Sequence, residues 1–266
     1  MKRLYNELCD IVRRAGEIIL SAHDVDSEGT VFSKAGDSAN LVTVYDTQTQ
    51  KFIINEILSL VPDAVFIAEE KENDSEQLGS DYCFVIDPID GTANFVHDYR
   101  HSCISLALFS HGEARYAIVY DPYLDEMFTA ESGGGAYLNG NRICVSDREP
   151  DVAMVAFGTA PYQKSRFSKA TFALGEKLFR SCRDIRRSGT AALDLAYLAA
   201  GRNDIFFEFS LSPWDFAAGG LIITEAGGII TDSDGRVLDY KASSDVFAAN
   251  KKCHSFLLDA VKEIKA

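Results

Sequence analysis

Residues 84–92 read Phe84-Val85-Ile86-Asp87-Pro88-Ile89-Asp90-Gly91-Thr92. The opening apolar run is typical of a buried strand. The proline then forces the chain out of the ladder of backbone hydrogen bonds, and the glycine permits a close backbone approach. This pattern predicts two aspartates at the end of a strand, where α/β proteins usually place their sites. In isolation, Asp-Pro and Asp-Gly are also ordinary turn dipeptides.

Acidic residues also stand at the borders of two other expected elements. Glu69 and Glu70 end the apolar run at 66–68, although an isolated pair of this kind is more often solvated surface. Asp215 lies in the first turn of an expected helix, after Ser212 as N-cap and Pro213, which is good helix-start chemistry without any function. Each of these acids therefore has an ordinary structural explanation when it is taken alone.

Convergence of Glu69, Asp87, Asp90 and Asp215 would change that interpretation. Carboxylates about 4 Å apart repel by roughly 4 kcal/mol per pair at an effective dielectric constant of about 20, so they must protonate or bind cations. Oxygen ligands without histidine or cysteine favour Mg²⁺ over zinc. Two such ions side by side suit phosphoryl hydrolysis, one activating a water and the other stabilising the leaving alkoxide.

Three motifs resemble the signatures of the inositol monophosphatase family. They are Ala68-Glu69-Glu70, the run from Asp87 to Thr92, and Trp214-Asp215-Phe216-Ala217-Ala218-Gly219. Their order and spacing agree with that family over nearly the whole chain, from Lys34 to Asn250. The resemblance implies a mixed α+β and α/β fold, the layered αβαβα sandwich of the sugar-phosphatase (inositol monophosphatase/fructose-1,6-bisphosphatase) type, and a homodimer.

The resemblance also implies a role for each matching position. Two or three Mg²⁺ ions would be held by Glu69, Asp87, the backbone carbonyl of Ile89, Asp90 and Asp215. The substrate phosphate would meet Gly91 and Thr92, and the attacking water would be positioned by Glu69, Thr92 and Asp46. The remainder of the substrate would contact Asp90, Gly189, Thr190, Ala191, Glu208 and Asp215. Lys34 corresponds to a lysine near the phosphate.

The implied enzyme is an Mg²⁺-dependent, lithium-sensitive phosphomonoesterase that uses direct attack by a metal-activated water. Its first-choice reaction is the conversion of myo-inositol 1-phosphate to inositol and phosphate. Fructose 1,6-bisphosphate, 3′-phosphoadenosine 5′-phosphate and histidinol phosphate are alternative substrates within the family. Glu208 favours a polyol monophosphate, because a carboxylate accepts hydrogen bonds from hydroxyl groups and repels a second phosphate. An adjacent arginine could override that preference.

Two further classes stay open as hypotheses. Haloacid-dehalogenase-like phosphatases have an Asp-x-Asp-Gly-Thr loop after a strand and use its first aspartate as a nucleophile. In this chain two residues, not one, separate Asp87 from Asp90. Trapping an aspartyl-phosphate on Asp87 would revive that class. A metal-binding scaffold that acts as an interaction protein is the alternative outside the hydrolases.

Length and charge bound the remaining possibilities. The 266 residues, 47% of them hydrophobic, predict one catalytic unit over 1–266, with an α+β half at about 1–150 and an α/β half at about 151–266. The net charge of −14 disfavours nucleic acid and acidic membranes as partners, and it would also repel an anionic small substrate unless cations neutralise the site locally. The small phosphate ester is the partner that the family resemblance implies. Six widely spaced cysteines, no secretory segment and no long apolar run predict a cytoplasmic protein with reduced thiols.

Apolar periodicity predicts the remaining elements. Helices are expected at 4–19, from an N-cap at Asp46 to before Pro62, and near 167–181, 190–200, 213–226 and 252–264. Strands are expected at 41–45, 65–68, 83–86, 102–109, 116–120, 127–130, 152–157, 205–209, 228–231 and 246–249, with a loop at 23–40 and a hairpin turn at Asn139-Gly140. His97 and His101 lack a zinc-protease pattern, and Arg186 and Arg187 are most simply a salt-bridged surface pair.

Overall fold

The computed structural model describes residues 2–23, 25–26, 29–34 and 41–265. Its helices are α1 (Lys2–Leu20), α2 (Val44–Leu60), α3 (Thr92–Val96), α4 (Lys164–Ser181), α5 (Ala191–Ala199), α6 (Pro213–Glu225) and α7 (His254–Lys265). Its strands are β1 (Val31–Ser33), β2 (Leu41–Thr43), β3 (Val65–Ala68), β4 (Cys83–Asp90), β5 (Cys103–Ser110), β6 (Glu113–Asp121), β7 (Glu126–Glu131), β8 (Gly135–Leu138), β9 (Asn141–Ile143), β10 (Met154–Phe157), β11 (Asp184–Arg186), β12 (Ile205–Leu211), β13 (Ile229–Thr231) and β14 (Ser244–Ala249).

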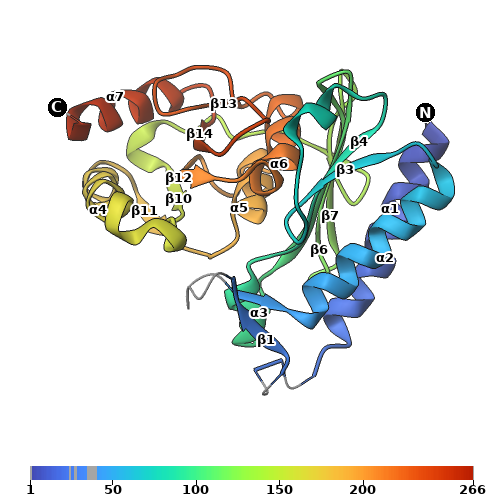
Figure 1. Ribbon diagram of the computed structural model, residues 1–266. Coiled ribbons are helices and arrows are strands. Elements are labelled where there is room, and N and C mark those ends of the chain that lie inside the picture. The colour runs from blue at the N-terminus through green and yellow to red at the C-terminus, as the bar shows by residue number, and fades with distance from the viewer. Residues whose placement is uncertain (1, 24, 27–28, 35–40, 266) are drawn as a thin grey trace.

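A large sheet has the strand order β3-β4-β5-β6-β7-β8-β9. Its β3 and β4 are parallel, and the other neighbours are antiparallel. Helices α1 and α2 cover one face (Figure 1), because their apolar stripes are buried against the alternate residues of the strands. Leu8 and Ile53 pack there with Phe84 and Ile86.

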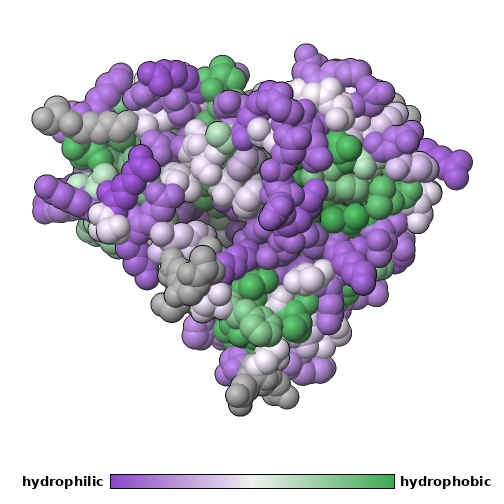
Figure 2. Space-filling view, viewed as in Figure 1, coloured by the Kyte–Doolittle hydropathy of each residue, from purple (hydrophilic) through white to green (hydrophobic). Residues whose placement is uncertain are grey.

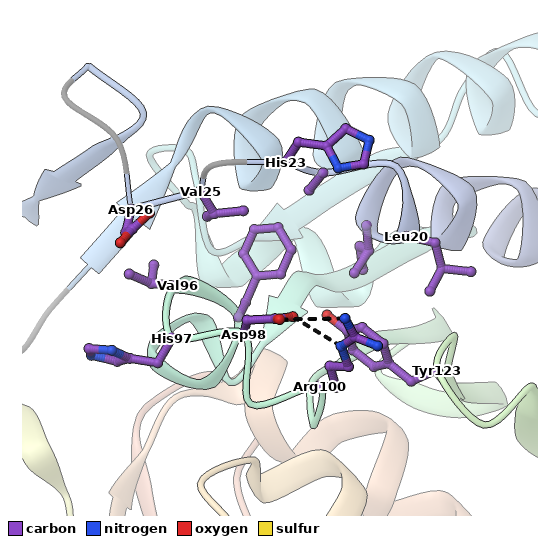
Figure 3. Close-up of a pocket in the computed structure, with 12 residues that line it drawn as sticks. Leu20, His23, Val25, Asp26, Val96, His97, Asp98, Arg100 and Tyr123 are labelled. Atoms are coloured by element: carbon purple, nitrogen blue, oxygen red, sulfur yellow. Dashed lines mark hydrogen bonds and ion pairs between the residues drawn. The ribbon is translucent and has the colours of Figure 1, made fainter.

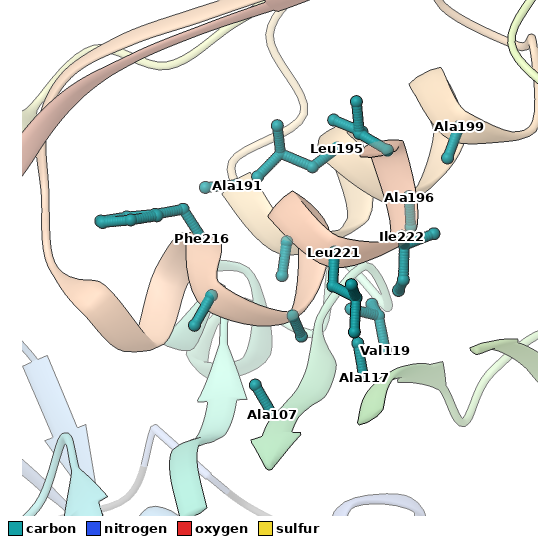
Figure 4. Packing of buried hydrophobic residues seen from close by; sticks show 14 of the residues in the cluster. Ala107, Ala117, Val119, Ala191, Leu195, Ala196, Ala199, Phe216, Leu221 and Ile222 are labelled. Atoms are coloured by element: carbon teal, nitrogen blue, oxygen red, sulfur yellow. The ribbon is translucent and has the colours of Figure 1, made fainter. Parts of the chain in front are cut away.

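Helices α5 and α6 fill the space between this sheet and a second one. Small and apolar residues dominate both helices, as expected of helices that are covered on more than one side. Leu195 of α5 and Ile222 of α6 belong to one cluster with Ala107 and Val119 of the large sheet (Figure 4). Fixing these helices also fixes the residues at their N-termini.

The second sheet has the order β11-β10-β12-β14-β13, and α4 and α7 pack on its outer face (Figure 1). Leu178 of α4 and Leu257 of α7 are fully buried there against Phe207 of β12. The layers run α1/α2, large sheet, α5/α6, second sheet and α4/α7. This arrangement confirms the αβαβα sandwich.

The N-terminal boundaries differ from the prediction. Asp46 is not the N-cap of α2, because Thr43 is the N-cap and Asp46 is the third helical residue. The strand expected at 41–45 is therefore shorter. The loop expected at 23–40 contains β1, which pairs antiparallel with β2, while its residues 24, 27–28 and 35–40 lie outside the described part. A paired strand of three residues is too short for a periodicity signal.

Surface and thiols agree with the sequence pattern. Within the described residues, no helix is long and apolar enough to span a membrane. The face seen in Figure 2 is mainly hydrophilic, with hydrophobic residues gathered in separate patches. All six cysteines are free thiols, and Cys83, Cys103 and Cys253 are buried.

Candidate active site

Parallel pairing of β3 with β4 places Glu69 next to Asp87. The register aligns Ala68 with Ile86, the residues that precede these two acids. The backbone N–H of Glu69 continues the ladder by donating to the Ile86 carbonyl at 3.2 Å. Two acids 18 positions apart in the sequence thus meet at one end of the sheet.

A bulge in β4 turns Asp87 and Asp90 to the same side. Asp87 lies opposite Ser105 and Asp90 opposite Cys103, so three steps along β4 match two along β5. In a regular strand, residues three apart face opposite sides of the sheet, and one extra residue restores a common side. Proline is tolerated in such a bulge because it has no N–H to donate. The Asp-Pro-Ile-Asp spacing follows from this geometry.

Capping boxes orient two further acids. Asp215 of α6 uses Oδ2 to accept the backbone N–H of Ser212 at 2.7 Å, and Asp46 of α2 accepts that of Thr43 at 2.7 Å. The capping bond fixes one carboxylate oxygen against the helix end. The other oxygen of Asp46, Oδ1, lies 3.3 Å from the Thr92 hydroxyl. The helix-start chemistry at 212–215 is confirmed, and it coexists with an acid of the cluster.

The carboxylates of Asp87, Asp90 and Asp215 form a compact group. Their ligand atoms all lie within 4.8 Å of one another. Burial and the neighbouring acids raise the pKa of Asp87 and of Asp215, and burial raises that of Asp90 to about 6. Because the donors are oxygen only, the group suits a hard divalent cation such as Mg²⁺.

Lys34 contacts acids at the edge of this group. Its Nζ lies 2.7 Å from Glu69 Oε1 and 2.5 Å from Glu70 Oε1. The Glu70 side chain is only 10% exposed, so the solvated-surface interpretation of the glutamate pair is wrong. The Lys34 ammonium neutralises carboxylates that a bound cation would otherwise face.

Thr92, Asp46 and the Ile89 carbonyl lie together. The Thr92 hydroxyl is 3.3 Å from Asp46 Oδ1 and 3.2 Å from the Ile89 oxygen, and it can donate to one of them at a time. Gly91 precedes Thr92 as the N-cap of α3 and supplies no side-chain cap. Burial raises the pKa of Asp46 to about 7.

The start of α5 holds Asp90. Thr190, the N-cap of this helix, donates its hydroxyl to Asp90 Oδ2, and the Ala192 N–H donates to the same atom at 2.7 Å. Ala192 was not predicted from the sequence, because a backbone donor leaves no side-chain signal. Gly189 and Ala191 line the same cavity.

Glu208 lies on the other side of that cavity, on β12. Its Oε1 accepts the Ala160 N–H at 2.9 Å, and a Cβ on Gly158 would come within 1.7 Å of its Oε2. Burial raises the pKa of Glu208 to about 7, and nearby Arg187 opposes the shift. Gly158 and Ala160 were not predicted from the sequence, because about fifty residues separate them from Glu208.

Asp194 of α5 is a buried acid that sequence reasoning missed. The Ser188 hydroxyl donates to its Oδ2 at 2.7 Å. Burial raises the pKa of Asp194 to about 8, and Arg187 opposes this shift too. Because it occupies an otherwise apolar helix, its only sequence signal was an acid in a small-residue run.

The candidate cavity has two parts of about 190 and 120 Å³. They share Asp90, Thr92, Glu208 and Asp215, so the acids and the Gly91-Thr92 turn face one space. A larger cavity of about 540 Å³ lies between the end of α1 and the segment after α3 (Figure 3). It is lined by His97 and by Arg100, which pairs with Asp98, and its chemistry is not that of a metal or phosphate centre.

His97 and His101 play no part in the candidate site. Among the described residues, neither belongs to a group of potential metal ligands. His97 is exposed, and the His101 ring lies 6.1 Å from that of Tyr197. Their surface and packing roles agree with the sequence interpretation.

Comparison with known proteins identifies the family of the chain. The sequence profile of the inositol monophosphatase family matches residues 1–266. The chain belongs to that family. It is 38% identical over 264 residues to Nus factor SuhB of Escherichia coli strain K12, covering 99% of the chain and 97% of the relative. It is 36% identical over 266 residues to Nus factor SuhB of Vibrio cholerae, covering 99% and 97%.

Solved structures support the same membership. The extragenic suppressor protein suhB from Bartonella henselae superposes with a TM-score of 0.90 at 33% identity, covering 98% of this chain and 99% of that one. An IMPase from Thermotoga maritima superposes with a TM-score of 0.86 at 33% identity, covering 100% and 98%. The family is one of phosphatases, and the fold is that of its solved members.

Proposed function

We propose that the chain is an Mg²⁺-dependent phosphomonoesterase of small polyol phosphates, with myo-inositol 1-phosphate as its first-choice substrate. The observation that carries this proposal is the group formed by the buried carboxylates of Asp87 and Asp90 and the partly buried one of Asp215, whose ligand atoms lie within 4.8 Å of one another and which shares its cavity with Thr92. Family membership supports the phosphatase class. The name of the similar proteins, Nus factor SuhB, leaves the substrate open.

In this proposal, two or three Mg²⁺ ions are held by Glu69, Asp87, the Ile89 carbonyl, Asp90 and Asp215. The all-oxygen donor set and the mutual repulsion of the carboxylates fit such ions. When bound, they supply charge neutralisation on the phosphate and a lowered pKa for a bound water.

The remaining steps belong to side chains and backbone. The N–H groups at the start of α3, at Gly91 and Thr92, hold the phosphate oxygens. The Thr92 hydroxyl orients the attacking water while it donates to Asp46, whose pKa of about 7 allows it to take up a proton near neutral pH. Glu69 fixes the water from the other side. Because no side chain attacks phosphorus, no covalent intermediate forms.

The hydroxyl-bearing part of the substrate meets Glu208, Asp90, Asp215 and the 189–191 turn. Glu208 is buried and already accepts one backbone N–H, so it has acceptor capacity left for a hydroxyl. Glu69 and Asp87 come from the first half of the chain and Asp215 and Glu208 from the second. A site shared in this way supports one catalytic unit over 1–266. A homodimer and a cytoplasmic location are part of the same proposal.

The test is phosphate release from the four candidate esters, each with Mg²⁺ and with EDTA. The esters are myo-inositol 1-phosphate, fructose 1,6-bisphosphate, 3′-phosphoadenosine 5′-phosphate and histidinol phosphate. We expect turnover only with metal and fastest on the inositol ester. A different preferred ester would correct the substrate, and silence on all four would remove the enzymatic proposal.

A second candidate function is a binding role, favoured by the name Nus factor that the curated relatives carry. An intact acidic site does not conflict with an additional binding surface. Capture of the same protein partner by the unmutated chain and by Asp90→Asn, together with negligible turnover of the unmutated chain, would favour this role. Turnover with no reproducible partner would refute it.

A further inference from the structure

One aromatic side chain, that of Tyr162, lines both parts of the candidate cavity. The larger part also contains Glu69 and Asp215. The smaller part also contains Thr190, at the start of α5. Burial and the charges of Glu69 and Asp215 raise the pKa of Tyr162, which agrees with a position beside these acids. Although burial contributes to this shift, 53% of the residue is exposed, as expected of a side chain in the wall of an open cavity.

The turn that carries Tyr162 is anchored to β12 on both sides of this residue. Before it, the Ala160 N–H donates to Glu208 Oε1 at 2.9 Å. After it, Gln163 Nε2 donates to Ser210 Oγ at 2.8 Å. Because the backbone is held at two points, the ring keeps a defined place in the cavity that Glu208 also lines.

The interior of the protein does not use the Tyr162 ring. Phe167, five positions along the chain, stacks on Phe209 with ring centroids 5.4 Å apart and packs on the outer face of the second sheet. Within the described part of the chain, the Tyr162 ring pairs with no other aromatic ring and its hydroxyl has no hydrogen-bond partner. Single exposed aromatic residues are ordinary on a surface, but this one is held in the wall of a polar cavity. Its ring is therefore free to contact a bound molecule.

We propose that Tyr162 is a specificity residue that packs its aromatic ring against the carbon face of a cyclic polyol monophosphate. The face of an aromatic ring is negative and attracts weakly positive C–H groups, and the contact also removes apolar surface from water. In myo-inositol most hydroxyls point outward from the ring, so axial C–H groups form its faces. Glu208 accepts hydroxyls at the edge of such a ring while Tyr162 covers a face, which an open-chain polyol cannot reproduce because it has no fixed face. This inference rests on the proposed phosphatase function.

The test compares Tyr162→Ser and Tyr162→Phe with a control, Tyr82→Ser. Tyr82 is 40% exposed, precedes β4 and is not among the described residues that line the candidate cavity. Steady-state phosphate release from myo-inositol 1-phosphate and from open-chain glycerol 2-phosphate gives kcat and KM for each protein. Loss of the ring in Tyr162→Ser should lower kcat/KM for the inositol ester by about 5- to 20-fold, mainly through KM. We expect changes below about 3-fold for the glycerol ester in Tyr162→Ser, and for both esters in Tyr162→Phe and Tyr82→Ser.

Three kinetic outcomes would overturn the inference. One is an equal loss on both esters in Tyr162→Ser, which indicates a structural role. Another is an unchanged KM for the inositol ester in that variant. The third is a loss in Tyr162→Phe as large as in Tyr162→Ser, which assigns the effect to the hydroxyl and not to the ring.

A binding experiment separates this inference from the proposed function. If the unmutated protein hydrolyses neither ester, the proposed function fails for its first-choice substrate. Titration with myo-inositol in Mg²⁺ and inorganic phosphate, followed by the fluorescence of Trp214, then still decides the role of Tyr162, since this single tryptophan lines the larger part of the cavity. Tyr162→Ser should bind myo-inositol about 5- to 20-fold more weakly than Tyr82→Ser. Equal affinity in these two variants, or no binding by the unmutated protein, would overturn the inference.

Discussion

Replacing Asp90 by asparagine should make the metal-free protein more stable and the enzyme inactive. Asp90 Oδ2 accepts hydrogen bonds from the Thr190 hydroxyl and from the Ala192 N–H. An asparagine of the same shape keeps both with its carbonyl oxygen. Its NH₂ group then faces the other acids and donates to carboxylates that a charged Asp90 would repel. The substitution removes repulsion without creating a cavity or an unpaired group.

The magnitude follows from the spacing of the ligand atoms. At the 4.8 Å limit, one ionised pair repels by about 3 kcal/mol at an effective dielectric constant of about 20. Partial protonation reduces this, because the pKa of Asp90 is about 6 and those of Asp87 and Asp215 are raised. The free energy of unfolding of metal-free Asp90→Asn should therefore increase by about 1–2 kcal/mol, which raises Tm by roughly 2–6 °C for a chain of this size. Loss of a metal ligand should cost at least about 10³-fold in kcat/KM, equivalent to about 4 kcal/mol.

The assay is thermal unfolding of both proteins in EDTA and over a series of Mg²⁺ concentrations, with phosphate release on the same samples. The unmutated protein should gain stability with Mg²⁺, since a ligand that binds the native state stabilises it. Asp90→Asn should have a higher Tm than the unmutated protein in EDTA, and its Tm should increase much less when Mg²⁺ is added. Equal Mg²⁺ stabilisation in both proteins, or near-full activity in the variant, would refute the reasoning.

Three other changes test separate parts of the site. Gly158→Ala places a Cβ within 1.7 Å of Glu208. It should lower kcat/KM for myo-inositol 1-phosphate by about 10-fold or more and leave kcat/KM for phenyl phosphate largely unchanged. Equal losses on both esters would contradict a substrate role for Glu208. The pKa of Glu208 is raised to about 7 and that of Asp194 to about 8, so these groups add stability that is present at low pH and lost as pH rises through these values. The free energy of unfolding of the metal-free protein, measured in urea, should therefore fall from about pH 5 to pH 8. A rise over that range would contradict the sign of these shifts. Lys34→Met leaves Glu69 and Glu70 without their counter-charge. It should lower the Tm of the metal-free protein and enlarge the increase in Tm that Mg²⁺ causes. An unchanged Tm in EDTA would show that these ion pairs contribute nothing to stability.

The sequence was sufficient for the layers and for the acids. Amphipathic periodicity located α1, and apolar runs located β3 and β4, because these elements are long enough or apolar enough to show their pattern. The spacing of Asp87 and Asp90 reflects the bulge in β4 that turns both side chains toward one side of the sheet. Asp215 was identified at a helix start, where it both caps the helix and belongs to the acidic cluster.

Other features depend on contacts that no local pattern encodes. The N-cap of α2 was misassigned to Asp46, because Thr43 and Asp46 are both good capping residues and only the backbone shows which one lies outside the helix. Ala192 acts through its backbone N–H, and Gly158 through the absence of a side chain beside Glu208. Whether an arginine pairs with a carboxylate or faces a cavity, as Arg186 and Arg187 do, is decided by the tertiary fold.

The central claim is that the carboxylates of Asp87, Asp90 and Asp215 hold divalent ions beside a phosphate on the start of α3. A crystal structure with Mn²⁺ and inorganic phosphate, read by anomalous scattering, tests it most directly. We predict anomalous peaks between these carboxylates, with phosphate oxygens on the Gly91 and Thr92 N–H groups. Mn²⁺ bound only elsewhere, or phosphate in another cavity with this one empty, would contradict the account.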